Sequence, residues 1–335
     1  MSTTLIPAPE PVRSVAEEQP EPAHTDGVRV RHLGKIYAGG VEALRDVSFD
    51  VERGEAFGLL GPNGAGKSTT IGILTTTVRP TKGEVWVGGY DVARDAVAAR
   101  SVSGIVFQDS VLDGAFAGRK NLELHARLWR IPKNRATERI PELIEAMGLS
   151  EAIDRPVRTY SGGQKRRLEI ARAVLGEPRV LFMDEPTVGL DPTIRQELWA
   201  LVRDLRARHD MTLMLTTHYL DEAERLCDRI AIIHEGRIVA MDSPSNLLTA
   251  LGDEILEVQA ETRPADLTAL LHQGGLQVER AFGVGSLLTL PLRNGDGDAA
   301  TRLLRDSTLP VRSIAVRKPT LDDVYVRLTG ASLGA

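Results

Sequence analysis

The sequence predicts an α/β protein with a mostly parallel sheet and a helical subdomain, followed by a smaller α+β domain. Short apolar runs at residues 55–60, 180–185 and 211–217 are bounded by glycine or polar residues. Such runs are typical of parallel strands that are buried on both faces. After about residue 250 the pattern changes to short strands and helices. We therefore expect one domain over residues 27–250 and a second over residues 251–335.

A glycine-rich loop follows the first apolar run. Residues 61–69 read GPNGAGKST and fit the pattern Gly-x4-Gly-Lys-Ser, and residues 68–77 can form a helix. In this pattern backbone N–H groups surround phosphate oxygens, the lysine reaches the outer phosphates and the serine coordinates Mg²⁺. The helix N-terminus also attracts an anion. The predicted phosphate-binding residues are Gly61, Pro62, Asn63, Gly64, Ala65, Gly66, Lys67, Ser68 and Thr69.

A second anion site is predicted where the sequence SGGQ precedes a helix over residues 165–175. The two glycines would let a phosphate approach the backbone, and the first helical turn would offer free N–H groups. Taken alone, the motif would be a serine N-cap before a flexible turn. Beside a phosphate-binding loop, anion binding is the stronger interpretation. The residues concerned are Ser161, Gly162, Gly163 and Gln164.

Two carboxylates end the apolar run at residues 180–185. Asp184 would hold Mg²⁺ largely through water, because this ion keeps several waters and takes few protein carboxylates. Glu185 would lie next to the γ-phosphate and orient the attacking water. The alternative is two solvated acids at a strand end, and the Pro186 and Gly189-Leu190-Asp191 turn that follows disfavours it.

His218 ends the run at residues 211–217 in the same way. Parallel strands would bring it beside Asp184 and Glu185. There it can hydrogen-bond a γ-phosphate oxygen without being the general base. A lone histidine is more often structural, so this interpretation depends on the neighbouring motifs.

Two further residues are weaker candidates. Gln108 follows the apolar run at residues 104–107 and can reach Mg²⁺ or the attacking water. Its loop would move with occupancy of the site. Tyr37 precedes Ala38-Gly39-Gly40 and could stack on adenine. A tyrosine alone is more often a packing residue.

Together these motifs resemble those of the ATP-binding cassette (ABC) family, over about residues 28–245. The resemblance implies a P-loop ABC ATPase cassette that binds and hydrolyses ATP with Mg²⁺. By this resemblance Tyr37 stacks on adenine, Gln108 belongs to the Q-loop, Ser161 to Gln164 form the signature, Asp191 belongs to the D-loop and His218 is the switch histidine.

The same resemblance implies that two cassettes close head to tail, with each ATP between one P-loop and the other chain's signature. The chain has one P-loop and one signature, so we expect a homodimer with two equivalent composite sites, or pairing with a related subunit. The complete residue set, including Glu185, favours a hydrolytically competent homodimer.

Two longer stretches, residues 216–244 and 317–330, resemble the ATPase subunits of the daunorubicin-resistance type of bacterial multidrug exporter. This resemblance implies a partner that is an integral membrane permease, and export of a drug-like or lipophilic substrate. It also implies a peripheral position on the cytoplasmic face of a bacterial cell membrane. The substrate itself is not predicted, because the membrane subunit selects it.

Composition agrees with a protein of this kind. The 335 residues are 42% hydrophobic and carry a formal charge of -5, which gives no nucleic-acid signature. The single cysteine, Cys227, cannot form an internal disulfide and is expected to pack. No stretch of about 18 apolar residues predicts a membrane span. Residues 1–26 are rich in proline and glutamate, and we expect a disordered tail rather than a signal peptide.

The helical subdomain is expected at about residues 110–165, with helices over residues 119–130 and 135–147. In ABC proteins this part receives a coupling helix of the membrane subunit. Four apolar residues could line such a groove or be ordinary core residues. They are Val111, Leu112, Phe116 and Trp129. The basic run at residues 165–167 is expected to be a solvated helix face.

The C-terminal part shows the order of a split βαβ, ferredoxin-like domain. The predicted elements are strand 254–260, helix 264–272, strands 276–282 and 286–292, helix 298–306, strand 311–316 and a capped helix from Thr320 to about Leu328. A dimer contact, a regulatory lid and simple stabilisation of the cassette all remain open as its role.

Two alternatives to transport remain. The first is a soluble ABC ATPase with a non-transport partner such as DNA or the ribosome. Such proteins usually have long coiled coils or two cassettes, and this sequence has neither heptads nor a second P-loop. The second is a non-hydrolysing regulator, which intact Glu185 and His218 disfavour.

Overall fold

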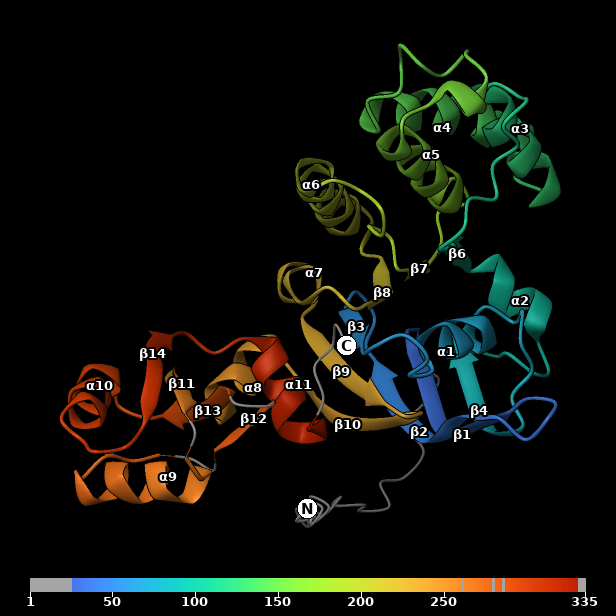
Figure 1. Ribbon diagram of the computed structural model, residues 1–335. Coiled ribbons are helices and arrows are strands. Elements are labelled where there is room, and N and C mark those ends of the chain that lie inside the picture. The colour runs from blue at the N-terminus through green and yellow to red at the C-terminus, as the bar shows by residue number, and fades with distance from the viewer. Residues whose placement is uncertain (1–25, 261, 279–280, 285–286, 331–335) are drawn as a thin grey trace.

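A six-stranded sheet forms the centre of the larger part of the chain (Figure 1). The computed structural model describes residues 26–260, 262–278, 281–284 and 287–330, so the predicted N-terminal tail lies almost wholly outside the described residues. In spatial order the strands are β10 (Arg237–Asp242), β9 (Arg229–His234), β3 (Ala56–Leu60), β8 (Thr212–Thr217), β7 (Val180–Asp184) and β6 (Ser103–Val106). All neighbours pair in parallel except β10 and β9.

The predicted parallel strands are therefore confirmed, with bounds shifted by about one residue. Strands β3, β7 and β8 are buried along their whole length, as expected for strands covered on both faces. Their shared direction brings the carboxyl end of each strand to the same edge of the sheet. That edge carries the glycine loop, the two carboxylates and the histidine.

A second, antiparallel sheet was not predicted from the sequence. Its spatial order is β2 (Glu42–Val51), β1 (Val28–Ile36), β4 (Lys82–Val87) and β5 (Tyr90–Asp91). Its apolar residues form a core with one face of the central sheet, and the Phe49 and Phe57 rings stack with centroids 5.1 Å apart. This packing fixes the position of β3, which leads into the glycine loop.

Helices surround the central sheet. They are α1 (Lys67–Leu74), α2 (Ala96–Ser101), α3 (Gly118–Leu128), α4 (Lys133–Ala146), α5 (Gly162–Val174), α6 (Pro192–His209), α7 (Leu220–Leu226) and α8 (Pro244–Leu251), with a short 3₁₀ turn at Val157–Thr159. Helices α3, α4 and α5 lie together, apart from α1 and the antiparallel sheet (Figure 1). Helix α6 begins where the Asp191 side chain accepts a hydrogen bond from the Ile194 N–H, and Pro192 fits its first turn.

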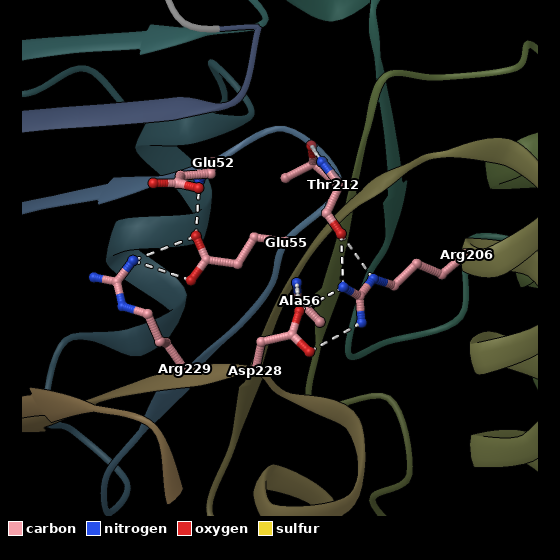
Figure 2. A network of polar contacts seen from close by, with 8 residues as sticks. Glu52, Glu55, Ala56, Arg206, Thr212, Asp228 and Arg229 are labelled. Carbon is pink, nitrogen blue, oxygen red and sulfur yellow. Dashed lines mark hydrogen bonds and ion pairs between the residues drawn. The ribbon is translucent and has the colours of Figure 1, made fainter. Parts of the chain in front are cut away.

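A polar network holds the amino end of β3 (Figure 2). Arg206 on α6 donates to the Gly54 carbonyl and pairs with Asp228, which in turn accepts from the Ala56 N–H at 2.9 Å. Glu55 pairs with Arg229 on β9 at 3.0 Å. These contacts join α6 and β9 to β3, and so fix one end of the strand whose other end carries the glycine loop.

The C-terminal part contains a four-stranded antiparallel sheet and its own apolar core. The spatial order is β12 (Phe282–Val284), β13 (Leu287–Leu292), β11 (Glu254–Ala260) and β14 (Val311–Arg317), with helices α9 (Pro264–Gln273) and α10 (Gly297–Arg305). The predicted strand over residues 276–282 is wrong in extent. Strand β12 begins at Phe282, where the prediction ended it, and Val278 makes an isolated bridge to Leu292; residues 279–280 lie outside the described part.

The last helix, α11 (Leu321–Thr329), joins the two parts. A capping box between Thr320 and Asp323 starts it, as predicted. Leu321, Val324 and Tyr325 belong to the same apolar cluster as the central sheet, not to that of the C-terminal sheet. The Tyr325 hydroxyl lies 2.7 Å from Nδ1 of His234 at the end of β9.

Candidate functional site

The candidate site lies at the carboxyl ends of three adjacent strands. In the sheet, Leu60 of β3 pairs with Thr217 of β8, and Asp184 of β7 pairs with Thr216 of β8. The glycine loop, Glu185 and His218 follow these strands directly, so residues more than 100 positions apart in the sequence meet here. Ligand sites of parallel sheets are usually found at this edge.

The glycine loop leaves an open cradle of backbone in front of α1. Gly64 and Gly66 have φ of 81° and 110°, a conformation that favours glycine. A side chain at Gly61 would place its Cβ 2.3 Å from the Ile233 carbonyl oxygen, so this position has no room for one. Helix α1 begins at Lys67 and points its free N–H groups into the loop. The residues present therefore fit a bound phosphate group.

Lys67 is buried and makes its contacts at the centre of the site. Its Nζ donates to the carbonyl oxygens of Gly61 at 2.8 Å and Pro62 at 3.1 Å. The same atom lies 3.1 Å from Oε1 of Glu185. Oε1 of Glu185 also lies 3.3 Å from Nδ1 of His218. The three ionisable residues predicted from separate motifs thus form one cluster.

The predicted metal ligands divide into two groups. The Ser68 hydroxyl donates to Oδ1 of Asp184 at 3.4 Å, and Thr216 donates to the same oxygen. A serine hydroxyl and a carboxylate in contact suit Mg²⁺, which takes few protein oxygens and keeps its waters. Gln108 is exposed just after β6, and within the described residues it makes no hydrogen bond to Ser68 or Asp184. The predicted Gln108 contact with the metal site is not formed in this structure.

Glu185 is held by its backbone as well as by its side chain. Its φ of 46° lies in the left-handed region, which is uncommon for residues other than glycine. Its N–H donates to the hydroxyl of Thr216 at 3.0 Å, and its carbonyl accepts from Arg166 at 3.2 Å. Sequence reasoning missed Thr216. Thr216 is the next-to-last residue of β8, where two threonines close the apolar run, and all residues of this strand are buried.

Tyr37 and Asp191 lie at the margin of the candidate site. Tyr37 is exposed, and its hydroxyl lies 3.3 Å from that of Thr69 in the glycine loop. The ring therefore borders the predicted nucleotide position. Asp191 is exposed and caps α6.

The SGGQ motif forms the first turn of α5, three residues earlier than the helix start predicted from the sequence. The Ser161 hydroxyl accepts from the Gln164 N–H at 3.2 Å, and the Gln164 side chain accepts from the Ser161 N–H at 3.1 Å. Within the described part of the chain, these four residues make no hydrogen bond to the glycine loop. Helix α5 belongs to the group of helices that stands apart from α1 (Figure 1).

Residues 44–188 match the ABC transporter family. The chain is 39% identical to the daunorubicin resistance ATP-binding protein DrrA3 of Streptomyces coeruleorubidus, over 87% of this chain and 92% of that protein. This chain belongs to the ABC transporter family. It is an ATP-binding subunit and an ABC-type ATPase.

Other relatives of this ABC subunit carry names that refer to other exported compounds. It is 38% identical to the Nod factor export ATP-binding protein I of Ralstonia nicotianae, over 95% of this chain and 98% of that protein. Its fold matches the dimeric post-hydrolysis structure of the ATP-binding cassette MJ0796 bound to ADP and Pi. That match has a TM-score of 0.59 at 26% identity and covers 64% of this chain and 98% of that one.

The expectation that residues 165–167 form a solvated helix face is wrong for Arg166. This residue is 6% exposed and binds the backbone of two motifs of the ABC subunit. The spacing of the buried residues Gly163, Arg166, Ile170 and Ala173 follows one helix face. Leu168, Glu169, Ala171 and Val174 are buried as well, so spacing along the helix did not by itself single out Arg166.

A cavity of about 170 Å³ lies between the helical group and the central sheet of the ABC subunit. His125 and Trp129 of α3 stack beside it with ring centroids 4.3 Å apart, and Arg172 of α5 borders it. Of the four apolar residues predicted to line a groove, Trp129 alone lines this cavity. Val111 and Phe116 are exposed in the loop before α3 and do not line this cavity.

No helix in the described ranges of the chain is both long and apolar enough to cross a lipid bilayer. Cys227 is buried and free, and burial raises the pKa of its thiol well above the usual value. The cysteine is therefore a packing residue, as predicted.

Proposed function

We propose that this ABC ATPase drives export of a drug-like or lipophilic substrate through a separate integral membrane permease. The cluster of Lys67, Glu185 and His218 at one sheet edge carries the ATPase part of this proposal. The names of the relatives, which concern daunorubicin resistance and Nod factor export, support the direction of transport. Their different substrates agree with selection by the permease.

Each site residue has a proposed role. Lys67 and the backbone of residues 61–69 bind the ATP phosphates, with Tyr37 stacking on adenine. When bound, Mg²⁺ would neutralise charge on the phosphate oxygens. Ser68 and Asp184 would hold it, and the Q-loop residue Gln108 would reach it after its loop moves.

Glu185 orients the attacking water in this proposal. Its carboxylate touches both Lys67 and His218, so it lies where the transferred phosphate would be positioned by the lysine. His218 senses the γ-phosphate by hydrogen bonding. The held backbone of Glu185 keeps the carboxylate in place without a change of conformation during the reaction.

The active unit is proposed to be a homodimer with two composite sites. Residues 161–164 make no contact with the glycine loop of their own chain, which supports a role toward a second chain. The dimeric cassette MJ0796 is a relative with this fold. Asp191 at the start of α6 would lie at the contact between the chains.

The permease is proposed to dock at the cavity between the helical group and the central sheet, on the side of Trp129. Trp129 is 48% exposed there, and the cavity is bordered by apolar atoms together with Arg172. An amphipathic cytoplasmic helix is the partner that such a surface accepts. The complex would sit on the cytoplasmic face of a bacterial cell membrane, with no nucleic acid bound.

The domain division is also part of the proposal. We infer a cassette over residues 27–250 with a helical subdomain at about 110–165, and an accessory domain over residues 251–335. The order of elements β11 to β14 and the strand order β12-β13-β11-β14 support a ferredoxin-like plan for the accessory domain.

Substitution Glu185→Gln tests the ATPase part of the proposal. ATP binding should be retained, because the glycine loop and Lys67 are unchanged, while steady-state turnover should be lost. Turnover at the wild-type rate would show that Glu185 does not orient the water.

The same variant tests the transport part. Tagged Glu185→Gln chain is purified from detergent-solubilised native membranes with ATP, and its stoichiometric partners are identified by mass spectrometry. A polytopic membrane protein is expected. Recovery of soluble or nucleic-acid partners alone would favour the alternative, a soluble ABC ATPase with a non-transport partner.

A further inference from the structure

A single buried guanidinium connects three of the motifs described above. Arg166 lies on α5, two residues after the signature glutamine. Its Nη1 donates to the carbonyl oxygen of Phe107 at 2.6 Å, and its Nη2 donates to that of Glu185 at 3.2 Å. Phe107 directly precedes the Q-loop residue Gln108.

The charge of Arg166 is balanced locally. Glu169, one turn later on the same helix, accepts from Nη1 at 2.8 Å, and both side chains are less than 10% exposed. A buried pair of this kind costs desolvation, which its own attraction repays only with good geometry and further hydrogen bonds. The further hydrogen bonds here go to two backbone carbonyls on other elements.

Those two carbonyls lie just beyond the ends of two neighbouring strands, Phe107 after β6 and Glu185 after β7. The peptide before Glu185 is anchored to β8 in the central sheet, through Thr216. The peptide after Glu185 is anchored to α5, through Arg166. The residue with the left-handed backbone is therefore held from both sides, by the sheet on one side and by the signature helix on the other.

We propose that Arg166 is a positioning residue that makes ATP hydrolysis depend on the orientation of the signature helix. A rotation of α5 relative to the sheet would pull the Glu185 carbonyl and the start of the Q-loop together, because one guanidinium holds both. The carboxylate of Glu185 would then move out of line with the attacking water. This inference rests on the proposed role of Glu185.

The test compares Arg166→Lys with Arg167→Lys in the full chain. Lysine keeps the charge beside Glu169, but its single amine lacks the planar fork that reaches two carbonyls at once. Arg167 is the matched control. It is the next residue on α5, and its contacts are the Met147 carbonyl and Glu197, away from Glu185.

For Arg166→Lys we expect kcat to fall by about ten- to a hundredfold with KM for ATP unchanged, because a small misplacement of a reacting group has an effect of this size. Hydrogen exchange of the backbone at residues 184–190 should become faster. Arg167→Lys should match the wild type in both measurements.

A second variant controls for misfolding that would follow if Glu169 were left buried without its partner charge. The double substitution Arg166→Gln with Glu169→Gln removes both charges together, and it should show the same fall in kcat with ATP affinity retained. Wild-type kcat in Arg166→Lys, or an equal fall in Arg167→Lys, would overturn the inference. The proposed role of Glu185 would still stand if Glu185→Gln lacks turnover, so the two failures are distinguishable.

Discussion

Lys67 and Glu185 form an ion pair that is almost completely removed from solvent. Such pairs are weak sources of stability, because desolvation offsets most of the attraction. Their presence together at one edge of the sheet, Lys67 at the start of α1 and Glu185 after β7, is better explained by the reaction, in which both charges act on a phosphate group. At the scale of single residues, the site is organised for chemistry more than for stability.

Ser161 carries a prediction about the signature. Substitution Ser161→Arg should abolish ATP turnover while leaving ATP binding at the glycine loop largely intact, because Ser161 makes no contact with that loop in its own chain. Turnover and nucleotide affinity are measured on the same preparation.

The control is Ser243→Arg, because Ser243 caps α8 in the same way that Ser161 caps α5. Either variant loses an N-cap, at a cost of about 1 kcal/mol. Turnover should fall in Ser161→Arg alone. Equal loss of ATP binding in Ser161→Arg would argue against a site shared between chains.

His125 carries a prediction about pH. Burial, with a smaller effect of Arg172, lowers the pKa of His125 from 6.5 to about 4. As the pH falls, His125 is therefore protonated in the unfolded chain before it is protonated in the folded chain. The free energy of unfolding is unaffected by this group above about pH 6.5 and falls as the pH drops toward 4. The loss should reach about 3 kcal/mol.

Substitution His125→Phe keeps the ring beside Trp129 and removes the titrating group. Denaturant unfolding at several pH values should show a smaller loss of stability in acid for the variant than for the wild type. An identical pH dependence in the two proteins would mean that His125 is not held neutral by burial.

At the scale of elements, the pairing of α5 with α6 depends on the second glycine of the signature. A Cβ at Gly163 would lie 2.8 Å from Cγ2 of Ile194 on α6, while a Cβ at Gly162 would lie 3.4 Å from Leu190. At Gly163 the added Cβ would force α5 or Ile194 to move, whereas at Gly162 it would make an ordinary van der Waals contact. The two adjacent glycines therefore differ in what they allow.

Substitution Gly163→Ala should lower the thermal midpoint, because overpacking of about 1–3 kcal/mol outweighs a gain of about 1 kcal/mol in helix propensity. Gly162→Ala is the matched control and should be neutral or stabilising. Adding Ile194→Ala to Gly163→Ala should recover part of the loss. A stabilised Gly163→Ala protein would contradict the close packing of the two helices.

The elements also differ in how well the sequence predicted them. Strands β3, β7 and β8 are continuous apolar runs, and they were placed within about one residue. The antiparallel sheet of β1, β2, β4 and β5 was missed, because its strands are interrupted by bulges that disturb their alternation. The strand predicted over residues 276–282 was misplaced, because β12 spans Phe282–Val284 and Val278 makes only an isolated bridge.

At the scale of the whole molecule, α11 packs the end of the C-terminal part against the central sheet. Its buried residues Leu321 and Tyr325 complete the core of the central sheet, and Arg327 donates to the Leu251 carbonyl of α8 at 3.4 Å. Removing these side chains should lower the free energy of unfolding by several kcal/mol, on the order of known large-to-small core changes.

Two deletion variants test this arrangement. One lacks residues 252–335; the other replaces residues 254–317 with a flexible Gly-Ser linker and keeps α11. A short linker suffices, because Ile255 at the start of β11 pairs with Arg317 at the end of β14, so the two cut ends lie side by side. Both should retain measurable nucleotide binding, and the second should have the higher thermal midpoint.

Equal midpoints in the two variants would show that α11 does not stabilise the cassette. Complete unfolding of both would instead make the C-terminal sheet part of the cassette core. The two variants differ in α11 and the residues beside it, so their comparison isolates the contribution of this helix.

The sequence by itself determined the α/β class, the glycine loop, the presence of the SGGQ motif before a helix and the chemical groups that end β7 and β8. These features depend on local spacing, and local spacing is written directly in the chain. Only the tertiary structure decided that Thr216 and Arg166 hold Glu185 from opposite sides, that Gln108 stays away from Asp184 and that α11 packs on the central sheet. These contacts join residues far apart in sequence, so they depend on how the elements pack and not on the pattern within any one of them.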